Sequence, residues 1–244
     1  MVDGGRWILV IKAGSTMPSL RSRSGDFEHW ILRGMGATPS EADVVNVEAG
    51  ERLPEHQAHA AIAITGSHAM VTDHWDWSDR AAAWLAEEVR LGTPVLGVCY
   101  GHQLLAYALG GDVADNPKGR EFGTVPLWLE AEARTDPLMR DLPSCLPAQA
   151  SHTQSVLRMP RGAVRLASSL MDANHAVRFA RSAWGVQFHP EFDAEVLREY
   201  ARHSREELVT EGRDPDRVLQ EIQETPLSAQ VLSRFVKIAR GAVR

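Results

Sequence analysis

The sequence predicts an α/β fold, a three-layer sandwich in which helices cover both faces of a mostly parallel central sheet. Two observations favour it. Short apolar runs of strand length alternate with helical patterns up to residue 111, and several of these runs end in glycine turns. The chain has 244 residues, of which 44% are hydrophobic, so it has enough material for a large core.

The N-terminal half is expected to form strands at residues 7–13, 43–47, 59–65 and 95–98. Helices are expected at residues 26–33, 75–91 and 101–109. Gly92 follows the second helix, where it fits a C-terminal cap. Residues 15–25 are polar and contain Pro18, so they predict a loop. Strands that alternate with helices in this order form parallel sheets buried on both faces.

From residue 112 the pattern changes to short β-rich runs, which predict a mixed or antiparallel extension of the sheet. We expect strands at residues 124–129, 163–168, 175–180 and 183–188. Helical patterns follow at residues 194–209, 215–222 and 226–238. We interpret residues 194–244 as a helical extension packed on the domain of residues 1–193, because the segment is too short for an independent catalytic domain.

Composition argues against several classes of protein. The formal charge of −6 is unlike the basic excess of nucleic-acid-binding proteins. No apolar run approaches the ~18 residues that span a bilayer, and Lys12 interrupts the apolar residues 7–11 before they reach signal-peptide length. Two cysteines make no disulfide framework. We therefore expect a cytoplasmic protein without a membrane or nucleic-acid partner.

The segment Gly-Val-Cys-Tyr-Gly-His-Gln at residues 97–103 has the clearest chemical content. It is the thiol counterpart of the Gly-x-Ser-x-Gly elbow, a strand-to-helix turn that exposes a nucleophile. Gly97 and Gly101 suit such a turn, because the helix lies so close to its strand that a Cβ would collide. Cys99 would lie at the helix N-terminus, where the positive end of the helix dipole favours a thiolate. Cys145 has no such context, and we treat it as inert.

A second block, Gly-Val-Gln-Phe-His-Pro-Glu at residues 185–191, supplies a base and an acid. His189 ends an apolar strand, and Pro190 fixes the backbone so that Glu191 can turn back to orient the imidazole. Cys99 alone would be a buried structural cysteine about as often as a nucleophile. The second block favours the nucleophile, since the three side chains then form a nucleophile–base–acid set. Histidine pairs elsewhere lack the clustered ligands of a metal site, so we expect no metal and no other cofactor.

An acyl-transfer site also needs donors for the developing oxyanion. The backbone N–H of Tyr100, which follows the nucleophile, is the first candidate. Residues 63–67 end a predicted strand in a glycine turn, so the amides of Gly66 and Ser67 are candidates for the second donor. A strand-ending glycine usually forms only a turn, and this assignment depends on the neighbouring motifs.

With these blocks the chain resembles the class I, or triad, glutamine amidotransferases, in particular stand-alone proteins similar to the amidotransferase part of GMP synthase. The resemblance covers residues 8–192. Besides the two blocks above, it rests on residues 64–67, 121–123 and 151–152. It implies a flavodoxin-like domain over residues 1–193. It also implies hydrolysis of the side-chain amide of L-glutamine through a cysteinyl γ-glutamyl thioester.

The resemblance assigns roles residue by residue. It implies Cys99 as the nucleophile, His189 as general base and acid, and Glu191 as the partner that orients the imidazole. It implies an oxyanion hole formed by Tyr100, Gly66 and Ser67. Gln103 and the segments around Phe122 and His152 would border the glutamine pocket.

Two departures from the family pattern affect what the chain can do. Gly66-Ser67-His68 replaces the Gly-Gly-Pro of many relatives, which leaves open whether the oxyanion hole is preformed or opens only with a partner. No phosphate loop or synthetase segment follows the amidotransferase blocks, so we expect no GMP synthesis by this chain alone.

Three functions therefore remain open. The chain can be a glutaminase that delivers ammonia to a synthetase on another chain. It can be a self-sufficient hydrolase of γ-glutamyl peptides, and residues 15–25 could then accommodate the larger substrate. It can also be a non-catalytic regulatory domain, although the intact Cys99, His189 and Glu191 argue against this.

Overall fold

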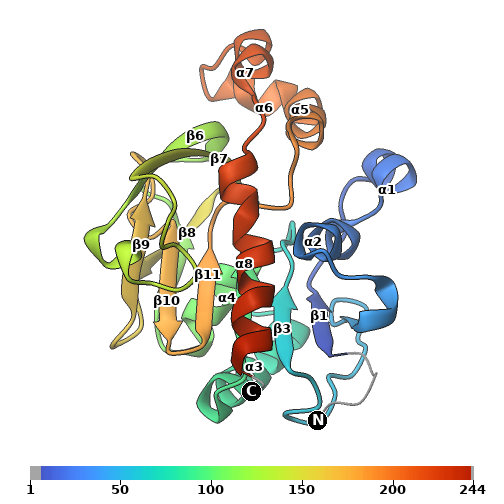
Figure 1. Cartoon of the computed structure of the whole chain (residues 1–244). Coiled ribbons are helices and arrows are strands. Elements are labelled where there is room, and N and C mark those ends of the chain that lie inside the picture. The colour runs from blue at the N-terminus through green and yellow to red at the C-terminus, as the bar shows by residue number, and fades with distance from the viewer. Residues whose placement is uncertain (1–6, 243–244) are drawn as a thin grey trace.

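A nine-stranded sheet organises the protein, which the computed structural model describes over residues 7–242 (Figure 1). The strand order is β2-β1-β3-β4-β11-β10-β9-β6-β7. In chain order the strands are β1 (Ile8–Lys12), β2 (Ala42–Asn46), β3 (Ala61–Ile64), β4 (Val95–Val98), β6 (Glu121–Leu129), β7 (Cys145–His152), β9 (Val164–Ser168), β10 (Ala176–Ala180) and β11 (Ala183–Val186). The first five strands in this order, β2, β1, β3, β4 and β11, are parallel. The remaining strands, β10, β9, β6 and β7, run antiparallel to their neighbours. The predicted α/β fold with an antiparallel extension is confirmed.

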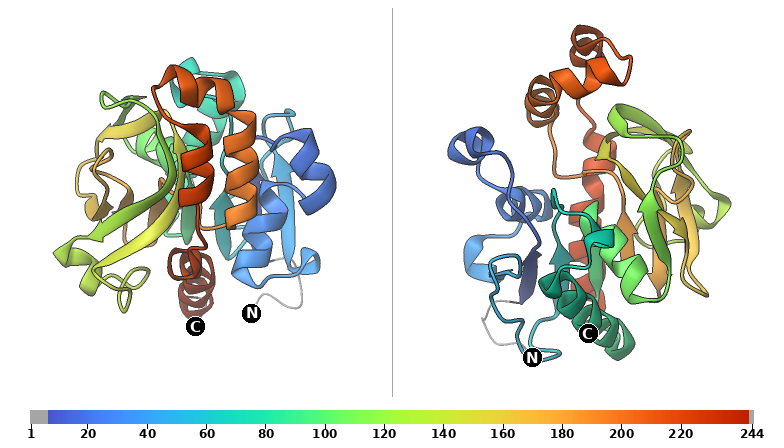
Figure 2. Two further views of the ribbon diagram at one scale, coloured as in Figure 1. Left: turned by 90° about the horizontal axis from the view of Figure 1, so that it is seen from above. Right: turned by 180° about the vertical axis from the view of Figure 1, so that it is seen from behind.

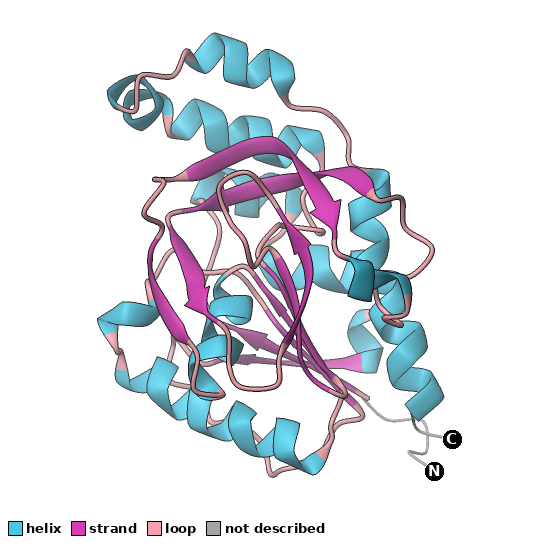
Figure 3. Ribbon diagram, turned by 90° about the vertical axis from the view of Figure 1, so that its left-hand side faces the viewer, coloured by secondary structure: helices cyan, strands magenta, loops and turns pink. Residues whose placement is uncertain are grey.

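Helices lie on both sides of the strands, as a side view shows (Figure 3). The α-helices are α1 (Pro18–Ser24), α2 (Phe27–Met35), α3 (Asp76–Leu91), α4 (Tyr100–Ala108), α5 (Ala194–His203), α6 (Arg205–Thr210), α7 (Pro215–Glu221) and α8 (Pro226–Ala242). Short 3₁₀ helices lie at Pro39–Glu41, Val71–Asp73 and Ala131–Arg134. Within residues 7–242, no helix combines the length and apolar character that crossing a bilayer requires.

Strand β1 illustrates how the sheet separates two hydrophobic cores. Ile8 and Val10 face the core that α2 and α8 complete, whereas Leu9 and Ile11 face the core that contains residues of α3 and α4. All residues of β1 are buried, because a parallel strand covered on both faces has no solvent side. Views from above and behind show α8 and α3 on opposite sides of the sheet, which confirms the three layers (Figure 2).

Most elements of the N-terminal half lie within a few residues of their predicted bounds. Helix α3 ends at Gly92, which has the left-handed conformation (φ 85°, ψ 9°) of a glycine cap. The loop predicted over residues 15–25 is wrong in part, because Pro18 begins helix α1. Proline is accepted at the first position of a helix, where its missing N–H removes no hydrogen bond.

The second half contains strands that the sequence patterns did not reveal. Strands β5 (Asp112–Asp115) and β8 (Gln154–Arg158) form a separate two-stranded sheet, and β7 was also not expected. These strands mix polar and apolar residues too irregularly for a period of two to stand out. The helix expected at residues 194–209 is divided into α5 and α6, which meet at Ser204.

The C-terminal helices take two different positions. Helices α5 to α7 lie at the top of the molecule in Figure 1, whereas α8 runs along the sheet. The side chains of Val231, Leu232 and Phe235 on α8 are fully buried in the same core as β1 and α2. A Cβ on Gly34 of α2 would overlap Leu232, so the two helices are in close contact. The division of the chain at residue 193 stays a prediction.

Candidate active site

Cys99 lies between β4 and α4 in a strained backbone conformation. Its φ of 50° and ψ of −103° fall outside the regions that side chains with a Cβ normally adopt. A Cβ on Gly97 would overlap the backbone of Gly101, and a Cβ on Gly101 would lie 2.7 Å from the Cβ of Ile64. The two glycines therefore allow α4 to lie against β3 and β4, as expected for an elbow. The cysteine is held with its side chain at the amino end of the helix.

His189 follows β11, the strand next to β4 in the sheet. Its Nδ1 lies 2.8 Å from Oε1 of Glu191, and its ring stacks on Phe192 with the centroids 4.0 Å apart. Burial opposes protonation of the imidazole, but the charges of Glu191 and Cys99 outweigh it and raise the pKa of His189 to about 10. The geometry thus favours an imidazolium beside the sulfur at neutral pH.

Cys99 and His189 meet at Gly66, which lies near the start of the loop after β3. A Cβ on Gly66 would lie 3.2 Å from Cε1 of His189 and 3.9 Å from Cβ of Cys99. Parallel strands β3, β4 and β11 bring these residues together, since their carboxyl ends lie at one edge of the sheet. Residues that are far apart in the sequence therefore form one compact group.

Thr65 fixes the orientation of the Gly66–Ser67 peptide. Its hydroxyl donates to the carbonyl of Gly66 at 2.9 Å and accepts from the N–H of Ala13 at 3.0 Å. The side chain of Ser67 accepts from the N–H of Ala69 at 3.0 Å. Because a trans peptide directs its N–H opposite to its carbonyl, the N–H of Ser67 points away from Thr65.

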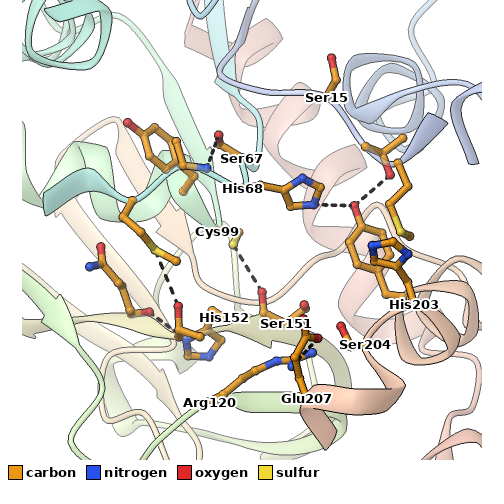
Figure 4. A pocket seen from close by; sticks show the side chains of 18 of the residues that line it. Ser15, Ser67, His68, Cys99, Arg120, Ser151, His152, His203, Ser204 and Glu207 are labelled. Carbon is orange, nitrogen blue, oxygen red and sulfur yellow. Dashed lines mark hydrogen bonds and ion pairs between the residues drawn. The ribbon is translucent and has the colours of Figure 1, made fainter. Parts of the chain in front are cut away.

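A cleft of about 740 Å³ opens at this edge of the sheet (Figure 4). The predicted site residues Ser67, Cys99, Tyr100, Gln103 and His152 line it. Clefts of roughly 300–1,000 Å³ are typical of small-molecule sites.

Phe122 is the predicted pocket residue that does not line the cleft. Its side chain is 3% exposed and packs in the hydrophobic cluster that contains Phe27, Trp30 and Phe192. Arg120 lies over its ring at 4.6 Å and lines the cleft instead. The segment around Phe122 therefore borders the cleft, although the phenyl ring does not.

Gln103 and Tyr100 join α4 to its surroundings. The side-chain amide of Gln103 donates to the carbonyl of Gln154 at 2.8 Å and to Oε1 of Gln187 at 3.1 Å. The hydroxyl of Tyr100 is hydrogen-bonded to Ser78, and burial raises its pKa to about 12. As the first residue of α4, Tyr100 has a backbone N–H without a partner inside the helix.

His152 belongs to a buried cluster beneath the cleft that the sequence motifs did not reveal. Its Nε2 lies 3.1 Å from Oε2 of Glu121, and Nε2 of His175 lies 3.0 Å from the same oxygen. Three such ligand atoms within 4.8 Å of one another could hold a metal ion. Both imidazoles already contact this carboxylate oxygen. Burial raises the pKa of Glu121, but the hydrogen bonds from the two histidines outweigh it and hold the pKa well below its usual range.

The C-terminal extension contributes cleft residues that the motifs gave no signal for. Tyr200 and His203 from α5 and Glu207 from α6 line the cleft. The hydroxyl of Tyr200 lies 3.3 Å from Nε2 of His68 and 2.9 Å from Oγ1 of Thr16, so it links α5 to both loops at the cleft. Burial, with the charges of His189 and His203, lowers the pKa of His68.

The comparisons with known proteins agree on one family. Residues 24–203 match the family model of the class-I glutamine amidotransferases. The chain is similar to the GMP synthase (glutamine-hydrolyzing) of Aeropyrum pernix, with 35% identity over 171 residues, which are 68% of this chain and 31% of that protein. The corresponding protein of Prochlorococcus marinus is 44% identical over 102 residues, 41% of this chain and 19% of that protein. The chain thus spans less than a third of the length of these relatives.

Solved structures share the fold at low sequence identity. A glutamine amidotransferase from Methylobacillus flagellatus superposes with a TM-score of 0.75 and 24% identity, covering 96% of this chain and 94% of that one. A glutamine amidotransferase from Thermotoga maritima gives a TM-score of 0.74 at 20% identity, covering 95% and 96% of the two chains. At this level of identity, the likeness supports the fold alone.

Proposed function

Because the chain belongs to the class I glutamine amidotransferase family, we propose that it hydrolyses the side-chain amide of L-glutamine to glutamate and ammonia. One observation carries the proposal. The strained Cys99 lies at a cleft beside an imidazole whose other nitrogen is 2.8 Å from a buried carboxylate. This is the geometry that activates a thiol for acyl transfer.

In the first half of the reaction, the Cys99 thiolate attacks the carboxamide carbon of glutamine. A sulfur–carbon bond forms, the carbon–nitrogen bond breaks, and the imidazolium of His189 gives its proton to the departing ammonia. The raised pKa of His189 supports this role, since the ring carries the needed proton at neutral pH. Glu191 holds the ring in place through Nδ1.

In the second half, the neutral His189 removes a proton from water. The water oxygen attacks the γ-glutamyl thioester, the sulfur–carbon bond breaks, and glutamate leaves. The proton that His189 takes from water replaces the one that it gave to the departing ammonia. The overall reaction consumes one water and needs no cofactor to balance.

We infer that the oxyanion hole is preformed. The N–H of Tyr100 provides one donor at the amino end of α4, and the N–H of Ser67 provides the second. The hydrogen bond from Thr65 to the Gly66 carbonyl supports this. It already holds the Gly66–Ser67 peptide with the Ser67 N–H pointing away from Thr65, so this peptide does not have to flip. This favours a site that works without a partner.

The ammonia acceptor is a separate question. The matched region is only 31% of the Aeropyrum pernix GMP synthase and 19% of the Prochlorococcus marinus one, so the synthetase chemistry of these relatives is not carried over to this chain. We propose that a synthetase on a separate chain accepts the ammonia. The alternative of a self-sufficient γ-glutamyl hydrolase is supported by the size of the cleft, of which a free amino acid would fill only part.

The test is release of glutamate and ammonia from glutamine by the purified full chain. We expect Cys99→Ala to abolish turnover, and the matched variant Cys145→Ala to retain it, because Cys145 is exposed and lies outside the cleft. Mass spectrometry of a quenched reaction should show a γ-glutamyl adduct on Cys99. Equal turnover by wild type and Cys99→Ala would refute the proposal.

A further inference from the structure

The buried cluster of Glu121, His152 and His175 beneath the cleft brings ligand atoms together from three segments. Glu121 begins β6 and lies directly opposite His152, which ends β7, and His175 immediately precedes β10. The three side chains are almost completely buried. One carboxylate oxygen and two imidazole nitrogens lie within 4.8 Å of one another. The register of β6 and β7 therefore fixes two of the three groups side by side.

The hydrogen bonds of His152 do not close with a neutral ring. Its Nδ1 lies 2.9 Å from the backbone carbonyl of Gln154, which can only accept, so Nδ1 carries the proton. Its Nε2 lies 3.1 Å from the carboxylate of Glu121, which when ionised also only accepts. A cation between Nε2 and the carboxylate removes this conflict, and the alternative is a second proton on the ring. Metal-binding histidines commonly donate their other ring N–H to a backbone carbonyl, as His152 does.

A second carboxylate in the same interior region lacks a partner. Asp172 is 2% exposed, and its Oδ2 has no hydrogen-bond partner among the described residues. Its charge influences the pKa of the buried His102, as do the charges of the two cluster histidines. Buried charges are normally paired or bind metals. With neutral histidines, a divalent cation would balance the carboxylates of Glu121 and Asp172.

We propose that Glu121, His152 and His175 bind one Zn²⁺ ion. Two imidazoles and a carboxylate are a known zinc ligand set, and imidazole favours such metals over Mg²⁺. The two nitrogen–oxygen distances of 3.1 and 3.0 Å are close to the roughly 3.3 Å that separates ligands on a tetrahedral zinc. His152 lines the cleft, which gives the ion a way in and a water for its fourth position (Figure 4).

The ion would connect the antiparallel extension of the sheet to the floor of the cleft. It would join the ends of β6 and β7 to the segment before β10. The carbonyl of Ser151, the neighbour of His152, lies 3.9 Å from the sulfur of Cys99. Zinc would therefore stabilise the fold beside the elbow, and it takes no part in the proposed hydrolysis of glutamine.

The experiment uses the untagged full chain, stripped of metal with a chelator and then given Zn²⁺. Unbound metal is removed by gel filtration, and the retained metal is counted by mass spectrometry. We expect one Zn²⁺ per chain with a Kd below about 1 µM. Free Zn²⁺ at about 100-fold above Kd should raise Tm by roughly 5–10 °C. Mg²⁺ should give no such rise, because it prefers oxygen ligands.

X-ray absorption of the zinc-loaded wild type tests the ligand set without any substitution. We expect nitrogen and oxygen neighbours, with the scattering pattern of imidazole and no sulfur. A sulfur neighbour would place the ion on Cys99 or Cys145 and overturn the proposal.

Substitutions then test the individual ligands. His175→Gln should weaken zinc binding by at least about 100-fold, more than the loss of an outer partner usually costs, and should abolish the rise in Tm. Glu121→Gln should do the same, and it replaces His175→Gln if that variant does not fold. The matched control is His56→Gln, because His56 forms a partly exposed pair with Glu88 far from the cluster in the sequence. It should keep the wild-type affinity.

Three further results would overturn the zinc site. They are a wild type that Zn²⁺ does not stabilise, full zinc affinity in both cluster variants, and loss of zinc from His56→Gln. In the first case a second proton on His152 holds the cluster together. None of these results bears on the hydrolysis of glutamine, which the assays with Cys99→Ala test separately.

Discussion

At the scale of single residues, protonation of His189 in the candidate active site depends on one carboxylate. The charge of Glu191 is the largest of the influences that raise the pKa of His189 and counter the effect of burial. Pro190 between them made this pairing predictable, because it limits the backbone between the two side chains. The contact of Thr65 with Ala13 was not predictable, since it joins the ends of two strands that are distant in the sequence.

Glu191→Gln should lower kcat for glutamine by roughly 10²- to 10⁴-fold, because the imidazole loses the partner that orients and charges it. It should also lower the pKa of His189. In the wild type the ring keeps its proton up to about pH 10, and in the variant the proton is lost at a lower pH. Measured from pH 6 to 10, the alkylation rate of Cys99 by iodoacetamide reports the change, and identical pH profiles would contradict it.

The same group has a consequence for stability. The pKa of His189 is higher in the folded chain than its ordinary value of 6.5. Its contribution to stability is therefore complete below pH 6.5 and is lost as the pH rises toward 10. Glu191→Gln should reduce this loss in denaturation measured at several alkaline pH values.

Thr65→Val tests the proposal that the oxyanion hole is preformed. The substitution keeps the shape of the side chain but removes the hydroxyl that holds the Gly66 carbonyl. We expect kcat for glutamine to fall about 10- to 100-fold, as a donor to the oxyanion is no longer fixed. KM should change much less, and an unchanged kcat would show that the peptide does not need this anchor.

At the scale of elements, the approach of α4 to its neighbouring strands positions Cys99, the proposed nucleophile. The Gly-x-Cys-x-Gly spacing predicted this approach, because only residues without a Cβ fit where Gly97 meets Gly101. The position of α6 beside the cleft was not predictable from its own residues. Leu208 is the one buried residue of α6, and the sequence does not say against which element it packs.

Gly97→Ala should destabilise the protein by about 3 kcal/mol, since its Cβ would overlap backbone atoms that cannot move independently. The matched control is Gly241→Ala near the end of α8, where a Cβ meets nothing within 4 Å. That change should be neutral or slightly stabilising, because alanine is the better helix former. Urea denaturation measures both, and equal stabilities would contradict the role of the elbow glycines.

At the scale of the whole molecule, two cores on opposite faces of one sheet bury polar groups as well as apolar ones. His102 on α4 is fully buried against Phe179 and Gly185. Burial lowers the pKa of His102 from 6.5 to about 3. The sequence placed His102 in a helix, but only the packing of α4 on β11 explains why its ring stays neutral.

His102→Leu should weaken the acid sensitivity of the fold. In the wild type the unfolded chain binds a proton at this position below pH 6.5 and the folded chain does not, so stability falls as the pH drops through this window. One such group contributes a slope of up to about 1.4 kcal/mol per pH unit. Urea denaturation between pH 5 and 7 should show a shallower slope in the variant, and parallel slopes would refute this.

The sequence by itself determined the order of strands and helices up to residue 111, apart from helix α1, and the candidate triad of Cys99, His189 and Glu191. These features follow from local spacing, which a linear pattern contains. The tertiary structure alone decided that the Phe122 ring packs in a hydrophobic cluster and does not line the cleft. It also decided that His152 shares the Glu121 carboxylate with His175 and that Glu207 lines the cleft. Such contacts depend on how distant elements pack, and the periodicity of a single segment specifies which face is buried without specifying its partner.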